Sequence, residues 1–267
     1  MAAKSIAFNF FPSKIALCIS PPEDLPGVFH ATEREFAERV KALQTFGYSV
    51  DIQRDLKTTE KIERYILETY PDGIDYLYWR AHSNPQSMLL SKSADGGYLY
   101  GGGIYDPVTG HLLKARPEKE VQREKRIFQS IRSGGVCLFE GCNAGEGDYN
   151  LAKKAAAYCQ TNVLVIASTT NDFFIEFYPS SPKYVRFITQ NSDVTRMYYQ
   201  TQSGPVEIPV YMFDLINAHR DERELTESMI DLCFRWFGEY RNCELSYFLK
   251  DDWKKKIGDF DCTRSRG

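Results

Sequence analysis

Two polar side chains follow apolar runs that resemble buried strands, and their types suggest nucleophilic catalysis. His82 follows the run IDYLYW (74–79), and Cys142 follows GVCLFEG (135–141) within a glycine-rich turn. A thiolate attacks acyl carbon atoms, and an imidazole manages the protons near neutral pH. The carboxyl ends of parallel strands share one edge of a sheet, where α/β proteins gather ligands and reactive groups. The sequence therefore predicts a catalytic pair of His82 and Cys142.

Packing is the alternative explanation for each of these two side chains taken alone. A cysteine often behaves as a small hydrophobic residue, and a single histidine is commonly a satisfied polar group. Their occurrence together, each following a predicted strand, favours the catalytic pair. The other cysteines and histidines lie in strand, helix, loop or hairpin patterns, and we interpret them as structural: Cys18, Cys137, Cys159, Cys233, Cys243, Cys262, His30, His111 and His219.

A regular alternation of strand and helix patterns must position these residues. Apolar, partly β-branched runs predict five strands, and apolar residues at helical spacing predict the helices between them. The strands are 14–20, 48–56, 74–79, 135–141 and 162–168, and the helices are 31–47, 58–70, 117–133 and 148–160, with Thr58 and Asp148 as expected N-caps. Alternating strands and helices favour an α/β fold, a three-layer sandwich with a mostly parallel central sheet.

Two regions depart from this alternation. The Gly- and Tyr-rich segment 89–113 contains DGG and DPVTG turns, which predict one or two hairpins. Beyond Ser168, the aromatic and Pro-broken stretch 169–209 predicts a short strand and long loops. The stretch 210–256 returns to a helical pattern.

The composition is that of an ordinary globular protein. Of 267 residues, 43% are hydrophobic and 26% charged, which suits one domain over 1–267 with a core at about 14–168 and an extension over 169–267. The net charge of −3 provides no field to attract nucleic acid or a membrane, and no run has the length of a membrane span or signal peptide. Seven cysteines without CxxC pairs argue against disulfides and zinc, so we expect a reducing, cytoplasmic location.

The ordered histidine and cysteine motifs resemble those of the caspase-like cysteine peptidases, the group of caspases, metacaspases, clostripain, separases and CHAT domains. Metacaspases carry Asp-x-Cys-His-Ser-Gly where this chain has EGCNAG (140–145), downstream of a strand that ends in His. The segment KALQTFGYSVDIQRDLKTTEKIERYI (41–66) is similar to the helix, Gly, strand, acidic-Leu turn and second helix of the group. The resemblance covers about 14–168 and implies a caspase-hemoglobinase-like fold.

The resemblance implies peptide-bond hydrolysis, with Cys142 as nucleophile and His82 as general acid and base. It also implies that the backbone N–H groups of Cys142 and Ser83 hold the oxyanion of the tetrahedral intermediate. The group usually has glycine directly after the histidine, where this chain has Ser83. We expect no metal ion and no organic cofactor. The expected partner is a protein or peptide substrate, and the long hairpin segment could serve as a lid or bind a protein regulator.

Specificity is also implied by the resemblance. In metacaspases an acidic residue two positions before the nucleophile lies at the base of the specificity pocket and selects Arg or Lys. Glu140 occupies that position here, and a recessed carboxylate would bind a cationic side chain through a charge-assisted hydrogen bond. Asp172 is a second candidate for the pocket wall. The alternative is that Glu140 pairs with an Arg or Lys of its own chain.

The sequence therefore predicts a caspase-like cysteine endopeptidase that cleaves after Arg or Lys. The alternative is a catalytically inactive interaction module of the same fold, which binds partners through the Gly- and Tyr-rich hairpin segment. A more distant alternative is an α/β transferase or amidase that uses the same thiol on a non-peptide acyl group.

Overall fold

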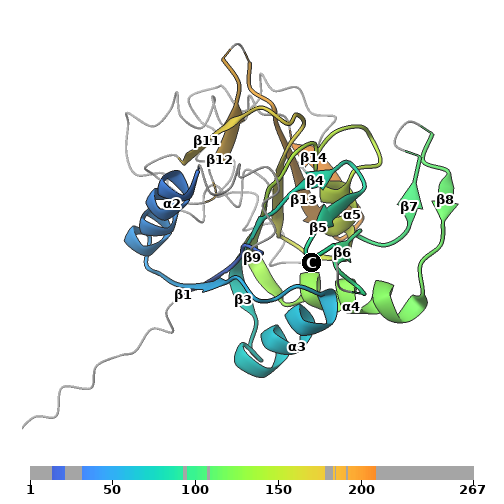
Figure 1. The fold of residues 1–267 in the computed structure, drawn as a ribbon, viewed down its shortest axis with the longest axis horizontal. Helices are drawn as coiled ribbons and strands as arrows, with labels where there is room; N and C mark the ends of the chain where they lie inside the picture. Colours follow the sequence, from blue (N-terminus) through green and yellow to red (C-terminus); the bar gives the residue numbers. More distant parts are fainter. Residues whose placement is uncertain are drawn as a thin grey trace, which may run out of the picture.

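The central sheet contains the five predicted strands and two more. The computed structural model describes residues 14–21, 32–92, 95–106, 109–177, 183, 185–190 and 192–208, which form an α/β fold with a mixed, mostly parallel sheet of seven strands (Figure 1). The order is β14 (Gly204–Ile208), β13 (Thr195–Thr201), β10 (Leu164–Ser168), β9 (Ile131–Glu140), β3 (Ile74–Arg80), β1 (Lys14–Ile19) and β2 (Tyr48–Gln53). β13 is antiparallel to both of its neighbours, and the five predicted strands are parallel.

Helices cover both faces of the described sheet. Figure 1 shows α2 (Glu33–Thr45) apart from α3 (Thr59–Thr69), α4 (Glu118–Gln129) and α5 (Leu151–Tyr158). Two apolar clusters explain this division: one contains residues of α2, and the other contains residues of α3, α4 and α5. The sheet lies between the two clusters, because its strands contribute alternate residues to each.

The strand period of two decides which residues face α2. In β3, Tyr76 and Tyr78 belong to the cluster on the α2 side, whereas Leu77 and Trp79 belong to the cluster on the other side. This alternation follows from the pleat of an extended chain, in which successive side chains point to opposite faces. Polar residues at even-numbered positions of β3 are therefore directed toward the face covered by α2.

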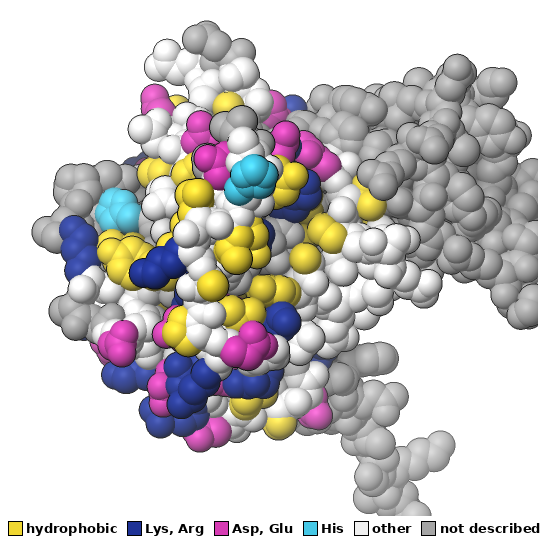
Figure 2. Space-filling model, turned by 90° about the vertical axis from the view of Figure 1, so that its right-hand side faces the viewer, with side chains coloured by type: hydrophobic (Ala, Val, Ile, Leu, Met, Phe, Trp, Pro, Cys, Tyr) yellow, Lys and Arg dark blue, Asp and Glu magenta, His cyan; other side chains and the backbone are white. Residues whose placement is uncertain are grey.

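The segment between β3 and α4 forms hairpins, as predicted. β4 (Ser83–Asn84), β5 (Ser87–Leu89) and β6 (Tyr98–Leu99) form a small antiparallel sheet, and β7 (Ile104–Tyr105) pairs with β8 (Leu112–Lys114). The β7–β8 hairpin lies away from the central sheet (Figure 1). Hydrophobic side chains are exposed on this side of the molecule (Figure 2), and Leu112 and Leu113 of β8 are 54% and 64% exposed.

A buried carboxylate on α4 anchors this hairpin segment. Glu124 is fully buried and accepts hydrogen bonds from the N–H groups of Tyr100 and Gly102. It also forms an ion pair with Arg116, whose guanidinium lies over the ring of Tyr100 at 4.3 Å. Burial raises the pKa of the Glu124 carboxyl, and Arg116 opposes that shift.

The structure corrects the predicted elements at two points, the boundary between α4 and β9 and the N-cap of α5. The helix expected over 117–133 ends at Gln129, and Ile131 already begins β9. The N-cap of α5 is Asn150, whose side chain accepts a hydrogen bond from the N–H of Lys153, and not Asp148.

The stretch beyond Ser168 contains more strands than the sequence predicted. In addition to β13 and β14, it contains a separate hairpin of β11 (Phe174–Phe177) and β12 (Val185–Ile188). The helical pattern predicted over 210–256 lies outside the described residues.

Glu124→Ala should destabilise the protein by about 3–5 kcal/mol, because it removes the buried carboxylate that pairs with Arg116 and accepts from the N–H groups of Tyr100 and Gly102, and leaves Arg116 with Glu120 as its one described carboxylate partner. Urea unfolding followed by circular dichroism measures this loss. Glu118→Ala, at an exposed position of the same helix, is the matched control and should change the free energy of unfolding by less than about 0.5 kcal/mol. Equal effects of the two substitutions would show that Glu124 is not an anchor.

Candidate active site

His82 and Cys142 follow neighbouring strands that are in register. Arg80 of β3 pairs with Glu140 of β9 at the carboxyl ends of these parallel strands. One further step of the two-residue alternation leads from these residues to His82 and Cys142. Both residues line one cavity of about 630 Å³ at this edge of the sheet. The structure thus brings the two predicted catalytic residues to a common cavity.

The walls of this cavity come from α2 and from the segment after β10. Asn171, Asp172 and residues of β11 line one side, and α2 lines another. Among the described lining residues, carboxylates outnumber arginine and lysine by five to one: Glu35, Glu38, Glu140, Asp172 and Glu176 against Arg39. Phenylalanines complete the wall, namely Phe173, Phe174 and Phe177. The cavity therefore combines acidic and aromatic surface around the candidate nucleophile.

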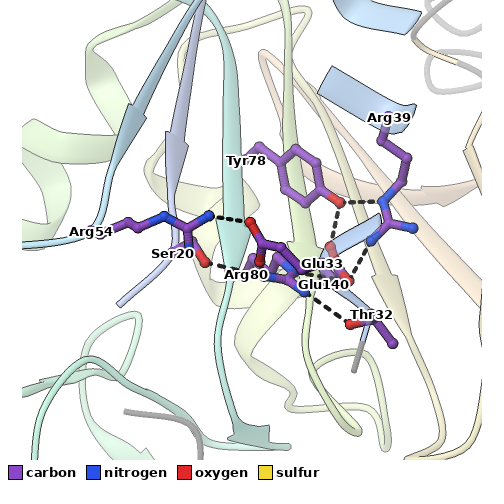
Figure 3. A network of polar contacts seen from close by, with 8 residues as sticks. All are labelled: Ser20, Thr32, Glu33, Arg39, Arg54, Tyr78, Arg80 and Glu140. Carbon is purple, nitrogen blue, oxygen red and sulfur yellow. Dashed lines mark hydrogen bonds and ion pairs between the residues drawn. The ribbon is translucent and has the colours of Figure 1, made fainter. Parts of the chain in front are cut away.

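Glu140 is the centre of a buried polar network at the base of the cavity (Figure 3). Its Oε1 pairs with Nη2 of Arg39 at 2.7 Å and lies 3.5 Å from Nε of Arg80. Its Oε2 accepts a hydrogen bond from the hydroxyl of Tyr78, and that hydroxyl accepts a hydrogen bond from Nε of Arg39 at 2.8 Å. Arg80 continues the network to Glu33 at 3.0 Å. Both carboxylate oxygens of Glu140 are thus engaged by the protein itself.

These contacts favour the alternative interpretation, in which Glu140 pairs with arginines of its own chain. Glu140 lines the cavity, but the residue is only 4% exposed. A substrate cation would have to displace Arg39 in order to reach Oε1. Asp172, the second candidate, is exposed on the loop between β10 and β11 and also lines the cavity. Its carboxylate is therefore the more accessible of the two.

The sulfur of Cys142 is half-buried at the cavity wall. Burial raises the pKa of its thiol, and the backbone N–H of the same residue partly opposes that shift. The Sγ atom lies 3.9 Å from the carbonyl oxygen of Asn171, a long contact for a weak donor. In this state the thiol is protonated at neutral pH, so nucleophilic attack requires a group that accepts its proton. His82 lines the same cavity and is chemically suited to that role.

Close packing shapes the turn that carries Cys142. A Cβ atom at Gly141 would lie 2.3 Å from Oγ of Ser83 and 2.7 Å from the carbonyl oxygen of Ala81, so the chain needs glycine there. Asn143, directly after Cys142, has a left-handed backbone with φ of 58°. Asparagine tolerates this conformation better than most residues do. Glycine before Cys142 and asparagine after it therefore permit a sharp turn at the rim of the sheet.

Ser83, the expected second oxyanion donor, lies directly after His82 at the beginning of β4. Its hydroxyl donates a hydrogen bond to the carbonyl oxygen of Cys142 at 2.6 Å. The side chain of Ser83 is thus directed to the main chain of Cys142.

Two arginines were missed when the sequence alone was considered. Arg39 belongs to an amphipathic helix, where arginine is normally a solvent-exposed residue. Arg196 of β13 donates to the carbonyl oxygens of Gly145 at 3.2 Å and Gly147 at 2.7 Å, and thereby holds the turn after Cys142. The role of Arg80 could have been inferred from the sequence, because this charged residue ends an otherwise apolar strand two residues before His82.

Comparison with known proteins does not assign the site to a family. No protein-family model matches the chain, and no curated protein sequence matches it. Across the described ranges, no cluster of three or more His, Cys, Asp or Glu residues could hold a metal ion. In the same residues, no helix is long and apolar enough to cross a membrane. The interpretation of the cavity therefore rests on its geometry and chemistry.

Glu140→Ala should lower the free energy of unfolding by about 3–5 kcal/mol, because it removes the buried carboxylate that pairs with Arg39 and leaves Arg80 with Glu33 alone among the described carboxylates. Differential scanning calorimetry gives the loss as a lower midpoint temperature. Asp172→Ala removes an exposed carboxylate of the same cavity and should change stability by less than about 0.5 kcal/mol. A neutral result for Glu140→Ala would contradict the network in Figure 3.

The rate at which iodoacetamide alkylates Cys142 should have the pH dependence of a thiol whose pKa lies above that of a free cysteine. Only the thiolate reacts, so the rate should rise about tenfold per pH unit through neutral pH and level off above about pH 8.5. In the native state Cys142 should react before Cys18, Cys137 and Cys159, which are buried. Mass spectrometry of digested samples measures each site. A midpoint below pH 7 would mean that the thiol is already ionised.

Proposed function

We propose that this protein is a caspase-like cysteine endopeptidase that cleaves after Arg or Lys. The observation that carries the proposal is the shared cavity of His82 and Cys142, which follow the paired carboxyl ends of β3 and β9. The parallel strand order β2-β1-β3-β9-β10 and the helices on both faces support a three-layer, caspase-hemoglobinase-like version of the fold. The protein or peptide substrate would lie along the acidic and aromatic wall.

The proposed chemistry begins with a neutral thiol. The sulfur of Cys142 forms a bond to the substrate carbonyl carbon while His82 accepts the thiol proton. The carbonyl electron pair moves to its oxygen, and the backbone N–H groups of Cys142 and Ser83 stabilise that oxyanion. The C–N bond then breaks, and His82 protonates the leaving amine. A water molecule activated by His82 hydrolyses the thioester and restores the thiol.

A preference for cationic substrates follows from the charge of the cavity. With Glu140 engaged by Arg39 and Arg80, the exposed carboxylates are available to a ligand, and Asp172 is adjacent in sequence to Asn171, whose carbonyl lies near Sγ. An Arg or Lys side chain would gain charge-assisted hydrogen bonds there. An Asp side chain would be repelled by the carboxylates of the cavity, and its loss of hydration would cost free energy.

An interaction module without turnover is the second candidate. It is favoured by the β7–β8 hairpin, on which Leu112 and Leu113 are largely exposed, since exposed apolar side chains on a projecting element are typical of partner surfaces. The raised pKa of Cys142 also suits this candidate, because an unactivated thiol is unreactive. Peptide turnover separates the two candidates directly.

Fluorogenic peptides that end in Arg should be hydrolysed faster than matched peptides that end in Asp, and the initial rates measure this. Cys142→Ala should abolish hydrolysis, and His82→Ala should lower kcat by about 10²–10⁴-fold, the usual contribution of a general acid and base. His111→Ala, at an exposed position near the β7–β8 hairpin, is the matched control and should retain activity.

Each alternative outcome has a definite meaning. Faster cleavage after Asp would refute the cationic preference and leave the peptidase proposal intact. If no peptide is cut and Cys142 is alkylated no faster than the buried cysteines, the interaction module is the better description.

A further inference from the structure

The peptide group between Cys142 and Asn143 is hydrogen-bonded at both ends. Its carbonyl oxygen accepts from Oγ of Ser83 at 2.6 Å, and its N–H donates to the carbonyl oxygen of Thr170 at 3.0 Å. Ser83 follows β3, and Thr170 follows β10. The peptide group after the candidate nucleophile therefore bridges the ends of three neighbouring strands, β3, β9 and β10.

Neighbouring contacts fix the backbone conformation on either side of this peptide group. The left-handed conformation of Asn143 costs free energy for a residue with a side chain, and it persists where neighbouring contacts hold it. Before Cys142, the absence of a Cβ atom at Gly141 leaves the space that Oγ of Ser83 occupies. The serine hydroxyl is thus packed directly against the chain that it holds.

The far end of the same turn is held by other groups. The N–H of Gly145 donates to the carbonyl oxygen of Ser168 at 2.8 Å. Arg196 donates to the carbonyl oxygens of Gly145 and Gly147. Removal of the Ser83 hydroxyl would leave these contacts in place, so its effect should be concentrated at Cys142 and Asn143.

We propose that Ser83 is a positioning residue, whose hydroxyl fixes the main chain of Cys142 relative to His82. The inference rests on the proposed peptidase function and adds a side-chain role for the residue that replaces the usual glycine. Ser83 is covalently adjacent to His82, so its hydrogen bond ties the imidazole segment to the nucleophile segment. A shift of the Cys142 main chain would redirect both the sulfur and the N–H of Cys142, the atoms on which attack and oxyanion stabilisation depend.

Three substitutions separate this role from a general effect on folding. Ser83→Ala removes the hydroxyl, and Ser83→Thr retains it. Ser87→Ala is the matched control, because Ser87 lies in the same small sheet and its hydroxyl bonds to the side chain of Asn84 at 3.3 Å. Circular dichroism establishes that each variant is folded, and Ser83→Gly, which also lacks the hydroxyl, carries the test if the alanine variant does not fold.

Amide hydrogen exchange and iodoacetamide alkylation test the positioning without any need for peptide turnover. In Ser83→Ala the amide of Asn143 should exchange at least about threefold faster, because its hydrogen bond opens more readily. Alkylation of Cys142 at pH 7 should slow about threefold, because a shift of its main chain moves the sulfur relative to His82, its proposed proton acceptor. Ser83→Thr and Ser87→Ala should match the wild type in both measurements.

The kinetic readout is the division between kcat and KM. Ser83→Ala should lower kcat by about threefold to tenfold, the value of one neutral hydrogen bond, with KM little changed, and Ser83→Thr should restore kcat. Unchanged exchange and alkylation in Ser83→Ala would overturn the inference, as would faster exchange with unchanged alkylation and kcat. If the wild type cuts no peptide, the proposed function fails, while exchange and alkylation still decide whether Ser83 positions Cys142.

Discussion

The buried charge of Glu140 is the constraint on which the candidate site depends. Transfer of a carboxylate out of water costs several kcal/mol even after the protein relaxes, unless other charges and hydrogen bonds compensate. Here the compensation comes from Arg39 on α2, Arg80 on β3 and the hydroxyl of Tyr78. One carboxylate thereby joins a helix and two strands at the carboxyl edge of the sheet. The cavity between α2 and this edge has a fixed base because of that network.

Cys142, the proposed nucleophile, lies two residues beyond this network. β9 delivers Glu140 to the α2 side of the sheet, and the next alternate position is Cys142 at the cavity wall. Polar pairing therefore occupies the end of the strand, and the thiol of Cys142 occupies the turn that follows. This division leaves Glu140 with a structural role and assigns contact with a ligand to the more exposed groups of the cavity.

The sequence was sufficient for those parts of the fold that depend on local periodicity. The apolar runs of the five parallel strands are long and regular, and the alternation of side chains within β3 and β9 directs His82 and Cys142 toward one face. The partners of Glu140 depend on contacts distant in sequence: Arg39 is 101 residues away, and no local pattern distinguishes a buried arginine on a helix from an exposed one. Beyond Ser168 one short strand was predicted where the structure has four, because proline and aromatic residues obscure the short alternation of these strands. The N-cap of α5 was predicted as Asp148 and is Asn150. The prediction failed because these two candidate caps lie two residues apart and propensity does not choose between them.

The turn after β9 is held from both sides, by Ser83 near its beginning and by Arg196 near its end. A ligand that enters the cavity therefore meets a preorganised main chain and does not have to pay the conformational entropy of ordering a loop. The free energy of association at this rim would then be governed by the exchange of hydration for direct contacts with the ligand. Differences in affinity among ligands of similar shape would accordingly report their charge and hydrogen-bonding groups.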